Sequence, residues 1–451
     1  MTFSIIQKSQ LEGALRLDAE YYQPKYLENN KAILDSGYQV ETLGKLIYPV
    51  KNGFDFRDFS TEGRPYLRAG DVLSGEVNFR GAAKIDIPAQ DVKKEIGLRP
   101  GDILFSRKGT YGRAAVVEED FANAVISSEV MRLRLKPSTI NPYFLSSYLN
   151  SKYGRLQVEQ RVHGISNFSI SQEDLKTVKL LILSGRTQSK IEELVKKAWG
   201  LLEESFSLFC RAEEKVLNEV GFKQIKLVNE LCHYIPLKKA VTDRRLDAEH
   251  FHTKFRKLRR YLEKTGKAKP LGELRSFIKR GLQPEYVEAG EIMVINSQHL
   301  GRTLLNTEST PRADKKFYEQ NERCQLRKND ALLYSTGAYI GRTNAYLDDN
   351  KAIASNHVTI IRTTKDCDPV YLAVYLNSPL GLMQTDQWAS GSAQREIYPD
   401  DIDKFLVYLP SLQFQQKVAN LVFESYQARK KSKELLEEAK RRVEEMVEKG
   451  G

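Results

Sequence analysis

Short apolar runs separated by Gly, Pro, Asn and Asp predict β-strands in two parts of the chain. The runs lie at 102–106, 114–117, 130–135, 293–296, 331–334 and 358–362. Apolar segments of this length, bounded by turn residues, are typical of strands. Asn141-Pro142 and Asp368-Pro369 each place an N-capping residue before a proline, which predicts that a helix begins there. Each part is therefore expected to be a mixed body, mostly β with a few helices.

Two later segments have a different periodicity. From Lys190 to Val220, and again over 418–446, apolar residues recur at steps of three and four without an internal proline. This is the pattern of one apolar stripe on a helix. Each helix would span about 30 residues, or roughly 45 Å, and could not bury its stripe alone. We expect the two helices to bury one another as an antiparallel coiled coil with pseudo-twofold symmetry. The alternative is that each helix packs on its own body as ordinary core.

The chain is one module written twice. The pentapeptide Arg-Leu-Asp-Ala-Glu stands at residues 16–20 and again at 245–249, and Tyr-Leu-Asn-Ser at 148–151 returns at 375–378. The period of about 228 residues is too long for a solenoid repeat and indicates a duplicated domain. The spacing of apolar positions is the same in both copies, whereas the polar residues expected at the surface differ. This pattern suits two modules that bind different versions of one kind of target.

The predicted fold class is α+β, with two tandem homologous mixed α/β domains, each followed by a long helix. The expected limits are 1–185 for the first body with its lead-in, 186–220 for the first helix, 221–411 for the second body with its lead-in and 412–451 for the second helix. A length of 451 residues is ample for two such copies.

Charge and cysteine content add supporting information. The chain has 70 Lys and Arg against 59 Asp and Glu, a net charge of +11, which favours a polyanionic partner such as nucleic acid. Its cysteines, Cys210, Cys232, Cys324 and Cys367, lack Cys-x-x-Cys spacing, so we expect neither a disulfide framework nor a zinc ribbon. Without a signal peptide or a long apolar segment, the predicted location is the cytoplasm, with no membrane contact.

No motif predicts catalysis or metal binding. Asn141-Pro142-Tyr143 resembles a methyltransferase motif, but its counterpart begins Asp368-Pro369-Val370, so the shared requirement is a capped helix start. Asp102 and Asp330 recur beside turn residues, where capping a turn is the expected role. His250 and His252 are two residues apart and would face different sides of a helix. Gly109, Gly112, Gly337 and Gly341 are expected to permit tight turns, since no phosphate-binding motif accompanies them.

Two similar bodies, each followed by a long helix, and the segment Gly-Asp-Ile-Leu-Phe-Ser-Arg-Lys-Gly-Thr-Tyr-Gly-Arg at 101–113 resemble the specificity subunit of type I restriction-modification systems. The resemblance covers nearly the whole chain. It implies that each body is a target-recognition domain for one part of a bipartite DNA site, and that the helices are spacers. It also implies double-stranded DNA and two DNA methyltransferase subunits as partners, with a restriction or translocase subunit as a further candidate, and no cofactor on this chain. S-adenosylmethionine is expected on the partner methyltransferase.

Candidate DNA-binding residues are polar loop residues that differ between the copies, because base edges are recognised by hydrogen-bonding side chains and phosphates by Lys and Arg. In the first body the candidates are Lys51, Asn52, Arg57, Arg64, Arg68, Arg107, Lys108, Thr110, Tyr111, Arg113, His163, Ser166 and Asn167.

The matching positions of the second body give a second set. Its members are Lys279, Arg280, Asn296, Gln298, His299, Ser335, Thr336, Tyr339, Arg342, Asn356, His357, Ser390, Gln394 and Arg395. For each residue alone, the competing interpretation is a solvated side chain or a structural turn contact.

The expected function is DNA-sequence recognition without catalysis, positioning partner subunits on an asymmetric bipartite site. If the helices separate the bodies by about 40 Å or more, the contacts lie more than one turn of B-DNA apart. The Arg-Leu-Asp-Ala-Glu elements are either ion-paired hinges or equivalent docking points for two methyltransferase subunits. The competing functions are a scaffold with two protein-binding heads and a diverged methyltransferase or nuclease.

Overall fold

The computed structural model describes residues 4–7, 17–88, 92, 97–118, 121, 123–137, 140–164, 168–226, 234–243, 245–307, 310–391 and 394–450. The chain forms two compact units, each described here by itself. Unit 1 comprises Met1–Leu202 and Lys430–Gly451, and unit 2 comprises Glu203–Arg429. These units follow contacts and divide each long helix, whereas the limits expected from the sequence follow the repeat and stay a prediction.

Unit 1 contains a four-stranded sheet of order β2-β9-β6-β7, antiparallel throughout. A second sheet, of order β3-β5-β4-β8, pairs β4 with β8 in parallel, and β1 pairs with β10. The strands are β1 (Gln39–Thr42), β2 (Lys51–Asn52), β3 (Phe59–Ser60), β4 (Arg64–Leu67), β5 (Ala83–Ile85), β6 (Ile103–Ser106), β7 (Ala114–Val116), β8 (Val125–Ile126), β9 (Val130–Leu133) and β10 (Lys179–Ile182). The helices are η2 (Ala19–Tyr22), α1 (Pro24–Leu34), α2 (Leu43–Leu46), η3 (Ala69–Asp71), α3 (Pro142–Asn150), α4 (Lys152–Arg161), α5 (Gln172–Lys176) and the start of α6 (Gly185–Val220).

Unit 2 has a similar topology, with three strands instead of four in its second sheet. Its four-stranded sheet has the order β12-β18-β15-β16, its second sheet the order β14-β13-β17 with β13 and β17 parallel, and β11 pairs with β19. The strands are β11 (Ala268–Pro270), β12 (Arg275–Arg280), β13 (Ile292–Ile295), β14 (Arg312–Ala313), β15 (Ala331–Tyr334), β16 (Thr343–Ala345), β17 (Ala352–Ala354), β18 (Val358–Thr363) and β19 (Leu406–Tyr408). The helices are η5 (Phe222–Gln224), α7 (Leu237–Asp243), α8 (Thr253–Lys264), α9 (Leu271–Leu274), η6 (Ser297–His299), α10 (Lys315–Gln320), η7 (Glu322–Cys324), α11 (Pro369–Asn377), α12 (Pro379–Trp388), α13 (Pro399–Ile402) and the start of α14 (Leu412–Lys449).

The predicted strands and helix starts are confirmed. The central strands β6, β9, β15 and β18 coincide with the apolar runs. The Asn141 side chain accepts hydrogen bonds from the backbone N–H groups of Tyr143 and Phe144, and Asp368 does the same for Val370 and Tyr371. Capping of this kind satisfies backbone donors that the first helical turn leaves unpaired.

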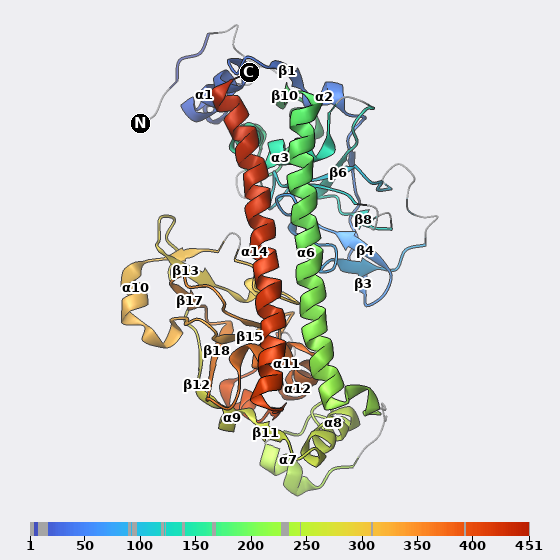
Figure 1. Ribbon diagram of the computed structural model, residues 1–451, viewed down its shortest axis with the longest axis vertical. Helices are drawn as coiled ribbons and strands as arrows, with labels where there is room; N and C mark the ends of the chain where they lie inside the picture. Colours follow the sequence, from blue (N-terminus) through green and yellow to red (C-terminus); the bar gives the residue numbers. More distant parts are fainter. Residues whose placement is uncertain are drawn as a thin grey trace. The chain divides into compact units, whose positions relative to one another are not determined.

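Both long helices form, and each unit contains a segment of both (Figure 1). In unit 1, Ile191 and Val195 of α6 share one hydrophobic core with Ala439 and Val443 of α14. The early residues of α6 thus meet the late residues of α14, which is the antiparallel arrangement expected for this pair. That core also includes strand residues of the four-stranded sheet such as Phe105, so the helices bury each other and the body together.

Unit 2 is built in the same way from the remaining segments. Val216 of α6 and Val418 of α14 lie in the core that also contains Ala331 and Ile361 of the sheet. The hydroxyls of Ser205 and Ser425 face each other at 3.1 Å between α6 and α14. Each unit therefore completes its core with a helix segment encoded in the other half of the chain.

Repeated side-chain contacts fix the turn before each central strand. Asp102 accepts hydrogen bonds from the backbone N–H of Arg99 at 2.8 Å and from Arg134 Nε at 2.7 Å. Asp330 repeats this arrangement with the Arg327 N–H at 2.8 Å and Arg362 Nε at 2.8 Å. Both aspartates are buried, so their carboxylates cap a turn, as expected from the sequence.

Candidate nucleic-acid interface

In unit 1, the β6–β7 loop (residues 107–113) is held closed by Ser106. The Ser106 hydroxyl donates to the Thr110 carbonyl at 2.6 Å and accepts from the Arg113 N–H at 3.0 Å. Gly109 and Gly112 have φ values of 69° and 81°, and Gly337 and Gly341 of unit 2 have 127° and 91°. Since this left-handed region favours glycine, all four permit tight turns as the sequence predicted.

Other segments meet this loop. The Arg107 N–H donates to the Glu129 carbonyl at 2.9 Å, and the Ile170 N–H donates to the Arg107 carbonyl at 3.1 Å. Lys108 forms a β-bridge with Ser169, and the Thr110 hydroxyl donates to the Ala69 carbonyl at 3.2 Å. The β6–β7 loop, the β8–β9 turn, η3 and the residues around the bridge between His163 and Ser169 therefore form one cluster, which we term the unit 1 loop cluster.

His163 and Ser169 are held by contacts with each other and with α5. His163 and Ser169 form a β-bridge, and His163 Nε2 lies 3.0 Å from the Asp174 carboxylate. Gln172 Nε2 donates to Asn52 Oδ1 at 3.0 Å, which joins the end of β2 to the same region. Ser166 and Asn167 lie outside the described residues.

The candidate residues of unit 1 differ in exposure. The exposed ones are Arg57, Lys108, Thr110 and His163. Those of intermediate exposure are Lys51, Asn52, Arg64, Arg68, Arg107, Tyr111 and Arg113. Arg64 begins β4 of the second sheet and donates to the Asn123 carbonyl at 3.5 Å, and Arg57 lies just before β3 of the same sheet. Neither has a described contact with the loop cluster.

Unit 2 has the same frame with different side chains. The Ser335 N–H donates to the His357 carbonyl at 2.9 Å, and the Gly337 N–H donates to the Arg395 carbonyl at 3.0 Å. Thr336 and Ser390 each form a β-bridge with Glu396. The β15–β16 loop, the β17–β18 turn and the 390–397 segment therefore form the unit 2 loop cluster.

In this cluster the cations are bound to internal partners. Arg280 Nη1 lies 2.6 Å from Glu396, and the Arg280 side chain also donates to the Thr336 hydroxyl. Hydrogen bonds, the largest from Tyr398, hold the pKa of Glu396 below its usual value. Sequence comparison did not select Glu396 or Tyr398. A sequence signal was present: Glu396 aligns with Ser169 of the first copy and differs from it in polar side chain. The structure places the two residues at the same bridge position.

The remaining arginines of the cluster are also engaged. The Arg342 guanidinium stacks 3.8 Å from the Tyr339 ring centroid, and burial lowers its pKa. Arg395 Nη1 lies 2.8 Å from Asp386. Both groups are oriented by contacts within the unit.

Asn296, the N-cap residue of η6, is hydrogen-bonded to the buried His299. The Asn296 N–H donates to His299 Nδ1 at 2.9 Å, as the Arg68 N–H donates to Asp71 Oδ2 at 2.9 Å in unit 1. Burial lowers the pKa of His299 to about 4, so its ring stays neutral and can accept this hydrogen bond.

Exposure also divides the unit 2 candidates. The exposed ones are Lys279, Gln298, Tyr339, Asn356, Ser390 and Gln394. Those of intermediate exposure are Arg280, Asn296, Arg342, His357 and Arg395. His299, Ser335 and Thr336 are buried, which gives them a supporting place behind the surface.

Features that suggested metal binding have structural partners. His250 is buried, with Nδ1 donating to the Gln387 carbonyl at 2.8 Å, and His252 accepts from the Lys254 N–H at 3.2 Å. In the part of the chain that the structure describes, no three His, Cys, Asp or Glu side chains are grouped to hold a metal ion. None of its helices is long and apolar enough to cross a membrane.

The repeated Arg-Leu-Asp-Ala-Glu element contains an internal ion pair in unit 2. Arg245 Nε and Nη2 each lie 2.6 Å from an Asp247 oxygen, which lowers the pKa of Asp247 to about 2. The leucines at the second position, Leu17 and Leu246, are 82% and 86% exposed. Arg16 lies outside the described residues.

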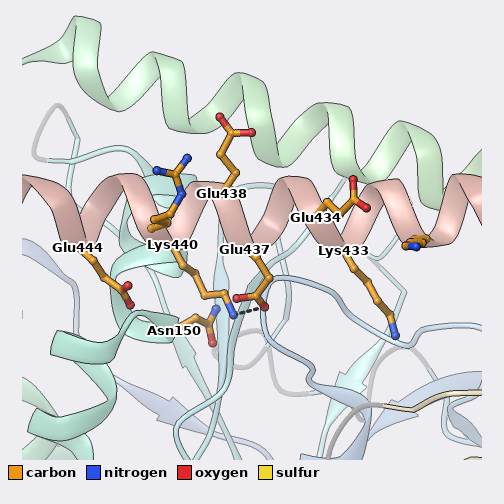
Figure 2. A pocket seen from close by; sticks show the side chains of 9 residues that line it. Asn150, Lys433, Glu434, Glu437, Glu438, Lys440 and Glu444 are labelled. Carbon is orange, nitrogen blue, oxygen red and sulfur yellow. Dashed lines mark hydrogen bonds and ion pairs between the residues drawn. The ribbon is translucent and has the colours of Figure 1, made fainter. Parts of the chain in front are cut away.

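A charged groove of about 640 Å³ follows α14 in unit 1 (Figure 2). It is lined by Asn150 and by acidic and basic residues of α14, including Glu437 and Lys440, which form an ion pair. The Asn150 side chain binds the backbone of Ala114. Because the lining charges are of both signs, the groove as described does not present one set of like charges to a small ligand.

Comparison with known proteins places these features in a family. The sequence matches the Type I restriction modification DNA specificity domain twice, over residues 37–198 and 269–440. It is 26% identical over 182 residues to the Type I restriction enzyme EcoBI specificity subunit of Escherichia coli, a match that covers 39% of this chain and 37% of that protein.

Solved structures that match the chain include the S subunit of a type I restriction-modification system from M. genitalium, with 15% identity, a TM-score of 0.38 and coverage of 92% of this chain and 96% of that chain. The HsdS subunit from Thermoanaerobacter tengcongensis has 18% identity, a TM-score of 0.28 and coverage of 92% and 96%. Since the family match covers the greater part of both copies, the chain belongs to the type I restriction modification DNA specificity family.

Proposed function

We propose that this chain is the DNA-sequence recognition subunit of a restriction-modification complex and performs no catalytic step itself. One observation carries the proposal: both copies match the DNA specificity family, and both present the same loop frame with different polar side chains. A constant frame with variable side chains is what two modules need to recognise different base sequences.

In unit 1, exposed cations would position the module on the DNA backbone. Lys108 and Arg57 are exposed and suited to phosphate contacts. The backbone of Arg107 is hydrogen-bonded within the loop cluster. Its side-chain Nε is buried and has no hydrogen-bond partner among the described residues. Its guanidinium is our candidate for a bidentate contact to guanine, the commonest specific arginine contact in the major groove.

In unit 2, amides take the corresponding places. Asn356 and Gln394 are exposed, and Asn and Gln side chains pair with adenine in the major groove. We infer that the two modules recognise different tracts, so the full site is asymmetric and bipartite. The base pairs between the tracts would not be contacted.

The proposed partners are two DNA methyltransferase subunits, with S-adenosylmethionine bound by them, and a restriction subunit as a further component. A duplicated chain offers any docking surface twice. The exposed Leu17 and Leu246 of the repeated pentapeptide support such a pair of surfaces, while the Arg245–Asp247 ion pair gives the element its shape. We propose that the complex acts in the cytoplasm, the location predicted from the sequence.

A direct test measures the binding of the purified chain to duplex DNA by mobility shift over a range of salt concentrations. We expect affinity to fall steeply with salt, since each neutralised phosphate releases counterions. The same preparation should neither methylate DNA with S-adenosylmethionine nor cleave it with divalent metal. Salt-independent binding, or either activity from the chain alone, would contradict the proposal.

A further inference from the structure

Helix α8 of unit 2 has an apolar inner side and a cationic outer side. It lies near α12 in Figure 1 and packs on α12 and β19, with Phe255, Leu258 and Leu262 buried. At about 100° per residue, the positions opposite these three form a single stripe. The stripe consists of Arg256, Lys257, Arg260 and Lys264.

Two charges of this stripe, those of Arg260 and Lys264, have no acidic partner on the helix. The acidic residue of α8, Glu263, pairs with Arg259 at 2.9 Å, which lies beside the stripe. Arg260 and Lys264 are exposed, and neither has an interaction within the described residues. Arg256, Arg260 and Lys264 follow at intervals of four, and like charges at this spacing destabilise a helix. A surface that lowers helix stability in this way is best explained by an anionic partner.

Several cations on other helices of the chain are paired with acidic residues. On α14, Lys431 pairs with Glu434 at 3.1 Å and Lys449 pairs with Glu445 at 3.1 Å. On α1, the counterpart of α8 in unit 1, Lys25 lies 3.6 Å from Glu159. Single cations without an interaction occur on other helices too, such as Lys190 of α6, so what distinguishes α8 is its run of three cations at intervals of four.

Cations outside the loop cluster of unit 2 could supply phosphate contacts that the arginines of the cluster are less free to make. Arg280 and Arg395 of that cluster are ion-paired with Glu396 and Asp386, and Arg342 is stacked on a tyrosine. These groups are less available for phosphate contacts than the exposed Lys108 and Arg57 of unit 1.

The segment before α8 runs beside the loop cluster. Arg245 donates to the Trp388 carbonyl at 3.2 Å, and His250 donates to the Gln387 carbonyl at 2.8 Å. Trp388 ends α12, and Ser390 of the unit 2 loop cluster follows two residues later. The start of α8 is thereby attached to an edge of the proposed DNA-binding face.

We propose that the α8 stripe binds phosphates of the DNA backbone next to the tract recognised by unit 2. This inference rests on the proposed function. A purely cationic stripe suits phosphates, which need only charge, better than a protein surface, whose buried centre is enriched in aromatic and other apolar groups. The stripe would add affinity without adding base specificity, and only to the second module.

The test compares two full-length double variants with the wild-type chain. Arg260→Gln with Lys264→Gln removes the two exposed stripe cations, and Lys431→Gln with Lys449→Gln removes the same net charge from α14. Binding to one duplex site is measured across salt concentrations, and thermal unfolding checks that both variants are folded.

For the stripe variant we expect the slope of log affinity against log salt to become shallower by about 0.9 for each cation removed. The ratio of wild-type affinity to variant affinity for the duplex should accordingly fall about tenfold between about 50 and about 200 mM salt. The preferred base sequence should stay the same. The α14 variant should keep the wild-type slope. A stripe variant with the wild-type slope would overturn this inference and leave an acidic protein surface as the occupant. A wild-type chain that binds no DNA would instead overturn the proposed function.

Discussion

Helix α14 should stabilise the two units separately through different residues of the same helix. Val443 is fully buried in the core of unit 1 with Ile191 and Val195, whereas Val418 is fully buried in the core of unit 2. Val443→Ala is therefore expected to destabilise unit 1, and Val418→Ala to destabilise unit 2. The two substitutions are chemically identical and serve as controls for each other.

The size of the effect follows from burial. Each substitution removes two buried methyl groups at about 0.8 kcal/mol each, and the remaining cavity adds about 1 kcal/mol. A loss of about 2.5 kcal/mol raises the opening equilibrium of the affected unit roughly sixtyfold. Native-state hydrogen exchange measures this change in peptides from β6 and β9 for unit 1 and from β15 and β18 for unit 2.

Val443→Ala should accelerate exchange in β6 and β9 while β15 and β18 keep wild-type protection. Val418→Ala should give the reverse pattern. If both variants accelerate exchange in the same unit, or if Val443→Ala affects only the peptides of α14, the late segment of α14 is not part of the unit 1 core and the reasoning fails.

Two further predictions concern specificity and pH. Replacing Arg107 by Ser and Lys108 by Thr, the residues that unit 2 has at these positions, should alter one half of the methylated site and leave the other half intact; sequencing of modified DNA measures this, and an unaltered site would remove both residues from the interface. His299 should make stability fall as pH falls from about 6.5 to 4, because its folded pKa of about 4 lies below the unfolded value, so the unfolded state binds the extra proton. The loss approaches about 3 kcal/mol for this buried group, and in His299→Asn denaturant unfolding should show a shallower decline over that range, whereas an unchanged decline would refute the assignment.

The apolar pattern predicted the parts of the fold that are determined locally. Strands such as β6 and β15 are entirely or largely apolar, and Asn141 and Asp368 cap helices by bonding to their own neighbours, so the necessary information lies within a few residues. The long helices were predictable for the same reason. Their apolar period is strong and uninterrupted.

Long-range pairing was less accessible from the sequence. The apolar stripe of α14 predicts that this face of the helix is buried. It does not reveal that the late residues of α14 lie in the core of unit 1 and the early residues in the core of unit 2. Strands of two or three residues, such as β3 and β14, have too few positions for a period to appear. They exist because neighbouring strands supply their hydrogen bonds.

The sequence predicted which loops carry the candidate residues, but it did not predict which of their side chains are exposed. Aligned polar residues need not share exposure: Lys108 is exposed, whereas its counterpart Thr336 is buried and bonded to Arg280 and Glu396. Polarity alone cannot separate a residue that faces solvent from one whose hydrogen bonds are satisfied inside. The roles of the candidate residues in DNA binding stay predictions.

The central claim, that each unit recognises its own tract of one DNA site, is tested most directly by selecting bound duplexes from a random library with the whole chain together with the proposed methyltransferase partner. The account predicts a consensus of two short tracts with different sequences, separated by base pairs without preference. A single contiguous consensus, or two tracts that are palindromic copies of each other, would contradict it.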